Sequence, residues 1–304
     1  MQIHLLGTAA GGGVPQWNCN CAVCREARAG AGRVRPRTQS CVAISPDGRG
    51  WFLLNASPDI RAQIENFRSL QPSPGKPRNS PIEGVLLTNA DLDHTLGLML
   101  LREGEKLRVH AAANVRRALT EGISFQPVLE SFCGTEWIEP STTATPLLRR
   151  DGLPSGLNYQ AIALPGKPPR FMKSKTIEGN VVGYHITDTK TGGRLLFLPD
   201  VAELNEIVLE WLPQCEALLF DGTFWSETEM RDQDLGSLTA ADMGHTPISG
   251  ATGSLKLLAE LNIQKKIYTH INNTNPILIE DSLEAAAVKA AGCTVGRDGM
   301  EFEI

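Results

Sequence analysis

The sequence has no long apolar run and no strong excess of charge of either sign. No stretch reaches the roughly 18 apolar residues that a membrane-spanning helix needs, so we expect no membrane partner. Its 29 Lys and Arg against 34 Asp and Glu leave a formal net charge of -5, which argues against nucleic acid as the main partner. The start, MQIHLLGTAAGGGVP, lacks the basic region and apolar core of a signal peptide, and we expect a cytoplasmic protein.

Cysteines are uncommon in the chain but unevenly placed. Three of the seven, Cys19, Cys21 and Cys24, form a C-x-C-x-x-C cluster, and an odd total disfavours a secreted disulfide scaffold. Three thiolates at this spacing can occupy three corners of a tetrahedral zinc shell. His245, in the polar loop DMGHTP, is our preferred fourth ligand. We therefore predict a structural Zn²⁺ at these four residues, with a metal-free trio of loop cysteines as the alternative.

The pattern of apolar residues predicts an α/β fold in which helices cover β-sheets. Hydrophobic residues make up 41% of the chain, enough for a sizeable core. Short apolar runs bounded by turn residues alternate with segments of helical periodicity. The expected strands are residues 3–6, 41–44, 51–54, 85–87, 108–110, 159–164, 181–186, 195–198, 217–220 and 266–268, and the expected helices are residues 114–121, 203–212, 254–261 and 282–290.

Two stretches rich in Pro and Gly, residues 72–81 and 165–180, interrupt this pattern. Both are too long for tight connections, and we expect surface loops or lids. Strands resume on each side of them without a change in composition, so neither is a domain linker. We therefore expect one domain over residues 1–304, with the cysteine loop at its N-terminal end.

Polar residues that can bind metals follow several of the expected strands. The turn TNADLDH carries Asp93 and His94, a hard oxygen and a borderline nitrogen that suit Zn²⁺, Mn²⁺ or Fe²⁺. Asp200 ends the run LLFLPD, and His270 ends the run KKIYTH. Because α/β folds form their sites at the carboxyl ends of strands, these residues predict a metal site. Taken alone, Asp93 could instead be a helix N-cap.

Other polar and aromatic residues have simpler interpretations. Asp221, after the run ALLF, is interpreted as a structural turn acid, and Trp225 as a wall for an aromatic substrate. His4, His110 and His185 lie among apolar neighbours, and we interpret them as core or sheet histidines.

The chain resembles the metallo-β-lactamase superfamily, which is marked by an H-x-H-x-D-H turn, a later strand ending in Asp and a late His. It is similar to the branch that takes part in the synthesis of the cofactor pyrroloquinoline quinone (PQQ). The resemblance implies an αββα sandwich of two mixed β-sheets flanked by helices. A related phosphodiesterase also pairs a C-x-C-x-x-C site with a distant His, which supports His245 as a zinc ligand. The segments that carry the resemblance are HLLGTAAGGGVPQWNCNCAVC, TNADLDHTLGL, LLFLPD, LLFDGTFW, MGHTPISG, IYTHINNTNPIL and GRDGMEFEI.

The chain departs from the superfamily pattern at one of its two metal positions. Asn89 and Asp91 stand where the superfamily turn has His, and residues 164–169 contain no His where a third is expected. The first metal position therefore loses most of its nitrogen ligands. A two-metal hydrolase needs both cations, so this departure argues against two-metal hydrolysis.

The second metal position keeps its ligands: Asp93, His94 and His270, with Asp200 where the bridging carboxylate lies. Two imidazoles and one carboxylate resemble the arrangement that holds non-haem Fe²⁺. The resemblance thus implies an Fe²⁺-dependent oxygenase that hydroxylates the tyrosine ring of a small or peptide-derived Glu–Tyr precursor of PQQ. Zn²⁺ and Mn²⁺ are the alternative metals, and Asp200 either joins the metal or orients a water molecule.

Further partners are also implied. Asn89 and Asp91 would either bind the active-site metal weakly or hydrogen-bond the groups that bind it. The loop cations Lys167, Arg170, Lys173 and Lys175 could pair with substrate carboxylates or form a solvated basic lid. Other PQQ synthesis proteins and a second copy of the chain are candidate partners. The alternative functions are a hydrolase with one or two metals and a non-enzymatic carrier of PQQ or its precursor.

Overall fold

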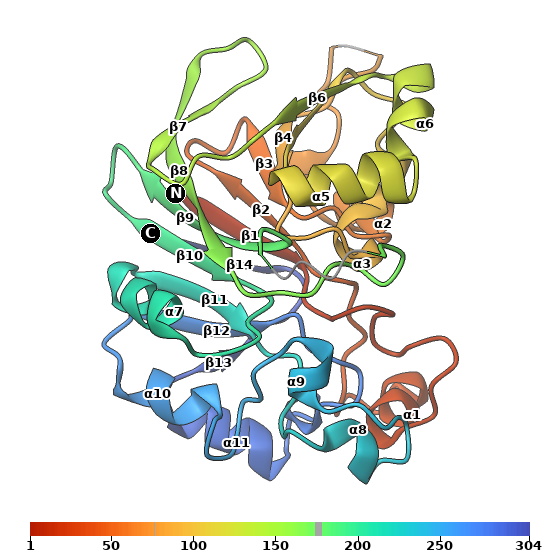
Figure 1. Ribbon diagram of the computed structural model, residues 1–304, viewed down its shortest axis with the longest axis vertical. Helices are drawn as coiled ribbons and strands as arrows, with labels where there is room; N and C mark the ends of the chain where they lie inside the picture. Colours follow the sequence, from red (N-terminus) through yellow and green to blue (C-terminus); the bar gives the residue numbers. More distant parts are fainter. Residues whose placement is uncertain (76, 174–177) are drawn as a thin grey trace.

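The computed structural model describes residues 1–75, 77–173 and 178–304 of the chain. Two seven-stranded β-sheets pack face to face, and helices cover the outer face of each sheet (Figure 1). Both sheets contain parallel and antiparallel pairs. This arrangement confirms the expected αββα sandwich.

The first sheet has the strand order β14-β1-β2-β3-β4-β5-β6. Its antiparallel part joins the two ends of the chain, because β1 pairs with both β14 and β2. From β3 to β6 the strands are parallel. The strands are β1 (Gln2–Gly7), β2 (Cys41–Ser45), β3 (Trp51–Leu54), β4 (Ile82–Leu86), β5 (Leu107–His110), β6 (Thr135–Ile138) and β14 (Met300–Glu303).

The second sheet has the order β13-β12-β11-β10-β9-β8-β7. Strands β7 to β10 are antiparallel, and β10 to β13 are parallel. The strands are β7 (Thr145–Leu148), β8 (Pro154–Leu164), β9 (Val181–Asp188), β10 (Arg194–Leu198), β11 (Ala217–Asp221), β12 (Lys265–Thr269) and β13 (Thr294–Val295).

The central strands are apolar throughout because both of their faces are buried. In β10, Leu195 and Phe197 point into the core between the sheets, whereas Leu196 and Leu198 point to the core under the helices. Side chains alternate between the two faces of a strand, so a strand covered on both sides reads as an unbroken apolar run. Strand β11 follows the same rule.

The helices fall into two groups by the sheet that they cover (Figure 1). Helices α2, α4, α5 and α6 cover the first sheet, and α1, α7, α10 and α11 pack against the second. No helix in the described part of the chain is long and apolar enough to span a membrane. The helices are α1 (Ala22–Ala29), α2 (Ile60–Asn66), α3 (Leu92–Thr95), α4 (Gly97–Leu100), α5 (Ala113–Arg117), α6 (Phe125–Phe132), α7 (Glu206–Trp211), α8 (Glu229–Asp232), α9 (Ala240–Met243), α10 (Ser254–Glu260) and α11 (Leu283–Ala290).

Most expected elements are confirmed, but two of the expected helices differ from their expected ends by more than one residue. Helix α7 begins at Glu206 rather than at 203, because the side chain of Asn205 caps it by accepting a hydrogen bond from Val208 N. The segment expected as a helix over 114–121 is α5 followed by a π-helical turn at Ala118–Gly122. The described parts of the stretches 72–81 and 165–180 contain no helix or strand, as expected.

The parallel strands bring several chain segments to one edge of the sandwich. The turn after β4 leads into α3, Asp221 is the last residue of β11, and the segments after β10 and β12 carry Asp200 and His270. Strands β10, β11 and β12 are neighbours in one sheet and run in the same direction. The carboxyl ends of these strands therefore converge, which is where open α/β sheets form their binding sites.

Candidate metal site and its surroundings

The turn between β4 and α3 fixes a buried histidine. His94 is 0% exposed, and its Nδ1 lies 3.1 Å from the hydroxyl of Thr88. Thr88 is itself held by Asn55, whose side chain bonds both the backbone N–H and the hydroxyl of Thr88. The other ring nitrogen of His94, Nε2, is buried with no hydrogen-bond partner among the described residues. A metal-binding imidazole usually has one ring nitrogen fixed by a hydrogen bond and the other available to the metal.

A second histidine comes from the loop after β12. His270 has a φ of 54°, a left-handed conformation that costs a non-glycine residue of order 1 kcal/mol. Its Nδ1 lies 2.8 Å from the hydroxyl of Thr223, and its Nε2 lies 3.2 Å from Asp93 Oδ2. The imidazole is therefore held between a hydroxyl and a carboxylate.

Asp93, His94 and His270 meet at one point, as the strand-end pattern predicts. Their ligand atoms all lie within 4.8 Å of one another. Asp200 joins them, with Oδ1 3.8 Å from His270 Nε2 and Oδ2 3.6 Å from His94 Nδ1. Asn89 donates a hydrogen bond of 3.1 Å to Asp200 Oδ2. We call Asp93, His94, Asp200 and His270 the Asp/His cluster.

Asp93 is not the N-cap of α3, which is the alternative interpretation of this residue. Asp91, not Asp93, is the N-cap residue of α3, and its side chain makes no capping hydrogen bond. Asp93 lies in the first turn, where its carboxylate faces His270. The glycine-rich loop after β1 lies against the same carboxylate, since a Cβ on Gly11 would be 3.4 Å from Asp93 Oδ2.

His245 lies beside the Asp/His cluster and not with the cysteines, which corrects its assignment as the fourth ligand of the cysteine zinc site. Its Nδ1 lies 2.8 Å from Asp221 Oδ2, and its ring stacks on that of His270 with centroids 5.4 Å apart. Its ligand atoms group with those of Asp200 and His270 within 4.8 Å. The reason is a contact between distant segments: Thr246 N donates to Val201 O over 2.6 Å and ties the His245 loop to the end of β10.

Asp221 is more than a turn acid. Its side chain is fully buried, and it accepts hydrogen bonds from Val201 N and from both the N–H and the hydroxyl of Thr223. It also pairs with His245. Asp221 and Thr223 thus fix the orientation of two imidazoles, those of His245 and His270.

The electrostatics of the site follow from acids and imidazoles that face one another. Burial disfavours charge on Asp93, but His94 and His270 hold the pKa of its carboxyl well below the ordinary value. Burial lowers the pKa of His270, yet Asp200 and Asp93 raise it to about 9. His245 behaves in the same way, because Asp221 raises its pKa against the effect of burial. The carboxylates therefore favour the protonated forms of His245 and His270.

Asp91 stands at the rim of this group. Desolvation and the nearby charge of Asp93 raise the pKa of Asp91 to about 6, although much of the residue is open to solvent. Asn89 contacts the cluster through its hydrogen bond to Asp200 Oδ2. The two residues that replace the superfamily histidines thus lie next to the cluster.

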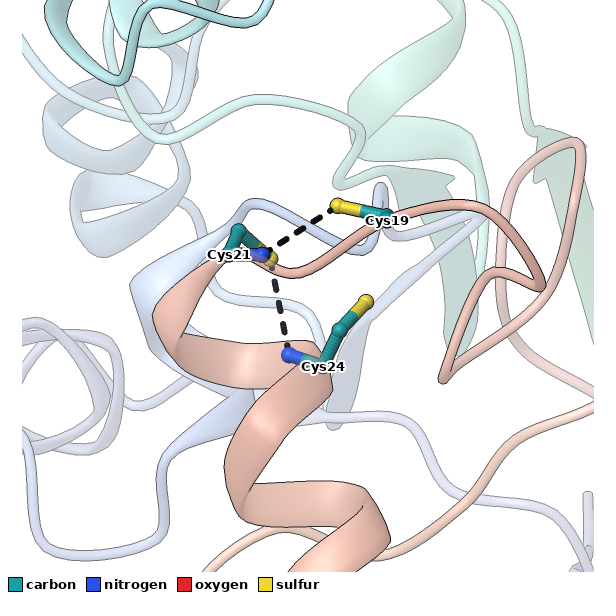
Figure 2. A group of neighbouring side chains, drawn as sticks. All are labelled: Cys19, Cys21 and Cys24. Carbon is teal, nitrogen blue, oxygen red and sulfur yellow. Dashed lines mark hydrogen bonds between the residues drawn. The ribbon is translucent and has the colours of Figure 1, made fainter.

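The three cysteines gather where the N-terminal loop enters α1 (Figure 2). Cys21 is the N-cap of α1, and its sulfur accepts a hydrogen bond from Cys24 N, while the sulfur of Cys19 accepts one from Cys21 N. Their sulfur atoms lie within 4.8 Å of one another. Three thiols in this arrangement have the chemistry and the closeness that a Zn²⁺ ion requires.

The fourth neighbour of the cysteines is Asn273. Its Nδ2 lies 3.3 Å from Cys24 Sγ, and its backbone carbonyl accepts a hydrogen bond of 3.3 Å from Cys21 Sγ. Burial raises the pKa of Cys21 to about 12, whereas the N–H of Cys21 lowers the pKa of Cys19 against the effect of burial. Asn273 lies three residues after His270, so the same loop contacts both groups.

Other predicted site residues lie elsewhere. Lys167 donates a hydrogen bond of 2.7 Å to the carbonyl of Asp242 in α9, and in the described part of the chain it forms no ion pair or hydrogen bond with the Asp/His cluster. Arg170 and Lys173 are exposed, and Lys175 lies outside the described residues. Lys167, the one loop cation whose side chain has a hydrogen-bond partner among the described residues, is therefore directed to α9.

The remaining histidines serve the core and the sheets, as interpreted. His110 Nδ1 lies 2.8 Å from the hydroxyl of Tyr159, and burial lowers the pKa of His110 to about 3. His4 stacks on Phe67, and His185 Nε2 lies 3.1 Å from a backbone carbonyl.

Trp225 packs, partly buried, against the core under the second sheet.

Comparison with known proteins identifies relatives along the whole chain. Residues 50–271 match the Beta-lactamase superfamily domain. The chain is 41% identical over 310 aligned residues to Coenzyme PQQ synthesis protein B from Methylorubrum extorquens, with 100% of both chains covered. It is 42% identical to the protein of the same name from Ectopseudomonas mendocina, with 99% of each covered.

Solved structures give the same result. The crystal structure of Zn²⁺-bound PqqB from Methylobacterium extorquens superposes with a TM-score of 0.90 at 40% identity, covering 100% of both chains. A diphosphatase of the PhnP family superposes with a TM-score of 0.69 at 19% identity, covering 100% of this chain and 97% of that one. The second likeness concerns the fold alone.

Proposed function

The chain belongs to the beta-lactamase superfamily and, within it, to the family of coenzyme PQQ synthesis protein B, and from this we propose that it acts in PQQ synthesis as a metal-dependent oxygenase. Its substrate is a PQQ precursor derived from Glu and Tyr, whose tyrosine ring it hydroxylates. The observation that carries the proposal is the meeting of one carboxylate and two imidazoles at Asp93, His94 and His270. Other proteins of PQQ synthesis would supply the precursor and consume the product.

The residues of the Asp/His cluster fit a divalent cation. His94 Nε2 is buried without a hydrogen-bond partner among the described residues, and the carboxylate of Asp93 lies 3.7 Å from it. Fe²⁺ held by two imidazoles and one carboxylate keeps coordination positions open and supplies oxygen-activating chemistry. Hydroxylation places one atom of O₂ on the ring and reduces the other to water, so the reaction requires a two-electron reductant.

The chain's own polar groups would prepare this site. Thr88 and Thr223 fix the rings of His94 and His270, and Asn89 holds Asp200. His245, paired with Asp221 and stacked on His270, is placed to hold or release a proton at the edge of the cluster. Asp91 adds a titratable acid at the rim.

We further propose that Cys19, Cys21 and Cys24 hold a structural Zn²⁺, with Asn273 as the neighbouring polar group. Thiolates are preferred zinc ligands, and the closeness of the three sulfurs supports such a site. The relative of 40% identity is a Zn²⁺-bound protein, which also supports zinc in this chain. The ion would fix the N-terminal loop to the loop that carries His270.

One observation favours a second function, a metal-dependent hydrolase. Asp200, His245 and His270 form another group of possible ligands that shares His270 with the first. Two cations at these groups could hold a water nucleophile and a leaving oxygen. Against it, Asn89 and Asp91 replace the histidines that the two-metal enzymes of this fold use.

Reconstitution with defined metals tests these functions. The protein is loaded anaerobically with Fe²⁺ or Zn²⁺, and then receives a Glu–Tyr-derived precursor, ascorbate as reductant, and O₂. We expect oxygen uptake that depends on the precursor, and a precursor that mass spectrometry shows to have gained one oxygen atom, with Fe²⁺ only. Iron binding without oxygen uptake would contradict the oxygenase, and precursor cleavage by the Zn²⁺ form without O₂ would establish the hydrolase.

A further inference from the structure

The turn that carries His270 is held by a hydrogen bond on each side. His270 has the left-handed φ of 54°, which the surroundings of a non-glycine residue must fix. On the side of β12, the carbonyl of Tyr268 accepts a hydrogen bond of 2.8 Å from Gly296 N. On the other side, Ile271 N donates one of 2.9 Å to the carbonyl of Thr8. The direction of the His270 imidazole therefore depends on the segments that contain Gly296 and Thr8.

The side chain of Arg37 joins these two segments. Its Nη1 donates one hydrogen bond to the carbonyl of Gly296 and another, of 3.1 Å, to the hydroxyl of Thr8. Burial lowers the pKa of Arg37 to about 10, so the guanidinium still carries its charge at neutral pH. Hydrogen bonds from a charged donor are stronger than those between neutral groups. One side chain thus contacts both neighbours of the His270 turn.

Asp298 completes the contact on the side of Thr8. Its Oδ1 accepts a hydrogen bond of 2.7 Å from the Thr8 hydroxyl, and its Oδ2 accepts one of 2.8 Å from the Thr38 hydroxyl. Thr8 is 0% exposed, so its hydroxyl needs partners within the protein. The hydroxyl accepts from Arg37 and donates to Asp298, and its orientation is therefore fixed by two charged groups.

The segment with Gly296 approaches β12 too closely for a side chain. A Cβ on Gly296 would lie 2.7 Å from the carbonyl oxygen of Tyr268, so only glycine fits here without a shift. Gly296 uses its N–H for Tyr268 and its carbonyl for Arg37. A change at Arg37 therefore reaches Tyr268 through a single residue.

We propose that Arg37 is a positioning residue of the Asp/His cluster. Through Gly296 and Thr8 it holds the turn that directs the His270 imidazole toward Asp93. Arg37 acts through these neighbours, because within the described ranges it forms no ion pair or hydrogen bond with the cluster. Its importance for function rests on the proposed metal site, whereas the geometry of the turn can be measured with no metal at the cluster.

The first test measures the turn itself. The protein receives one equivalent of Zn²⁺, which the thiolates prefer, and hydrogen exchange of single amides is followed by NMR. We expect the amide of Ile271 to exchange at least tenfold faster in Arg37→Met than in the wild type, the usual effect of losing hydrogen bonds from a charged group. The amides of β10 should change less.

A second pair of variants tests the same contact with a smaller change. Thr8→Val keeps the shape of the side chain and removes the hydroxyl that joins Arg37 to Asp298. We expect it to speed the exchange of Ile271 about fivefold, and Thr8→Ser, which keeps the hydroxyl, to restore slow exchange.

The matched control is Lys266→Met. Lys266 is a buried cation of β12 that donates to the carbonyls of Leu258 and Leu261, over 2.7 and 3.1 Å. Its loss also removes hydrogen bonds from a charged donor, but these lie away from the His270 turn. This variant should not speed the exchange of Ile271 more than that of the β10 amides.

The second test measures metal binding. Mn²⁺ is titrated into the same one-zinc protein and followed by electron paramagnetic resonance, since Mn²⁺ prefers oxygen and nitrogen ligands to thiolates. Binding that His94→Ala removes belongs to the Asp/His cluster. We expect Arg37→Met to weaken it about tenfold, the usual effect of losing a group that orients a metal ligand, and Lys266→Met to leave it unchanged.

Two results would overturn the positioning role. One is exchange of Ile271 that rises no more than that of the β10 amides in both Arg37→Met and Thr8→Val. The other is wild-type Mn²⁺ affinity in a variant whose turn has opened. A turn that opens selectively in a protein whose cluster binds no Mn²⁺ would keep the role of Arg37 in holding His270 and contradict the proposed metal site.

Discussion

The molecule contains two groups of possible metal ligands, and they differ in what holds them together. The cysteine group consists of three thiols whose close polar neighbour is the amide of Asn273. In the Asp/His cluster, carboxylates and imidazoles neutralise one another and are oriented by Thr88, Thr223 and Asn89. The loop after β12 contacts both groups, through His270 in one and Asn273 in the other.

The cysteine group and the Asp/His cluster therefore depend on a bound metal ion to different degrees. Three thiolates without a cation would repel one another, so the cysteine group needs an ion to exist in its charged form. The Asp/His cluster keeps its geometry through ion pairs and hydrogen bonds that require no ion. We therefore expect changes at the cysteines to affect stability and changes at the Asp/His cluster to affect activity.

The largest expected effect tests the activity side of this comparison. His94→Ala and His270→Ala each remove a ligand from the proposed iron site, and we expect both to abolish iron-dependent turnover of the precursor. Mass spectrometry of the hydroxylated product measures turnover, and circular dichroism on heating measures folding. The control is His185→Asn, which changes a histidine outside the cluster. Full turnover in both alanine variants would refute the site.

The second prediction concerns the stability side. Cys21→Ser or Cys24→Ser should lower the free energy of unfolding by about 3 kcal/mol, the stabilisation that a ligand gives at about 100 times its dissociation constant. Elemental analysis should show the loss of one zinc ion. Cys133→Ser, outside the cluster and partly exposed, should change neither value. Unchanged zinc content and melting temperature in the cluster variants would show that these cysteines bind no structural metal.

The third prediction asks whether orientation matters as well as ligation. Asp221→Asn removes the carboxylate that pairs with His245 and keeps its shape, and we expect turnover to fall about 10- to 100-fold. The same change should leave the zinc of the cysteine group in place. Wild-type turnover would mean that Asp221 has only a structural role.

The sequence predicts the cluster well where position in a strand determines position in space. Asp93, His94, Asp200 and His270 all follow buried strands, and the shared direction of β10 and β12 brings their ends together. The αββα arrangement is predicted by the resemblance and not by the apolar pattern. A central strand such as β10 is an unbroken apolar run in either sheet, so the pattern predicts a buried strand without showing which sheet it joins. The signal in each case is local and survives in a single sequence.

The residues that the sequence misplaces depend on contacts between distant segments. His245 is directed to Asp221 by a hydrogen bond between Thr246 and Val201, 45 positions apart in the numbering, and no local pattern encodes it. Asn273 reaches Cys24 across 249 residues, and asparagine is not a residue type that suggests a zinc site. The sequence does indicate that Asp221 is buried, because it directly follows the apolar run ALLF in β11. A buried carboxylate requires a hydrogen-bonding or charged partner.

The smallest predicted effect compares two buried histidines that differ in their partners. Carboxylates raise the pKa of His270 to about 9. His110 instead pairs with the hydroxyl of Tyr159, and burial, helped by the charge of Arg108, lowers its pKa to about 3. A histidine with a lowered pKa takes up its proton in the unfolded chain, so its contribution to stability is complete above pH 6.5 and decreases as the pH falls toward 3. Urea unfolding should show that the wild type loses about 1 kcal/mol more than His110→Gln between pH 7 and pH 5.5. Since the other titrating groups are common to both proteins, an equal loss would mean that His110 is not held neutral by burial.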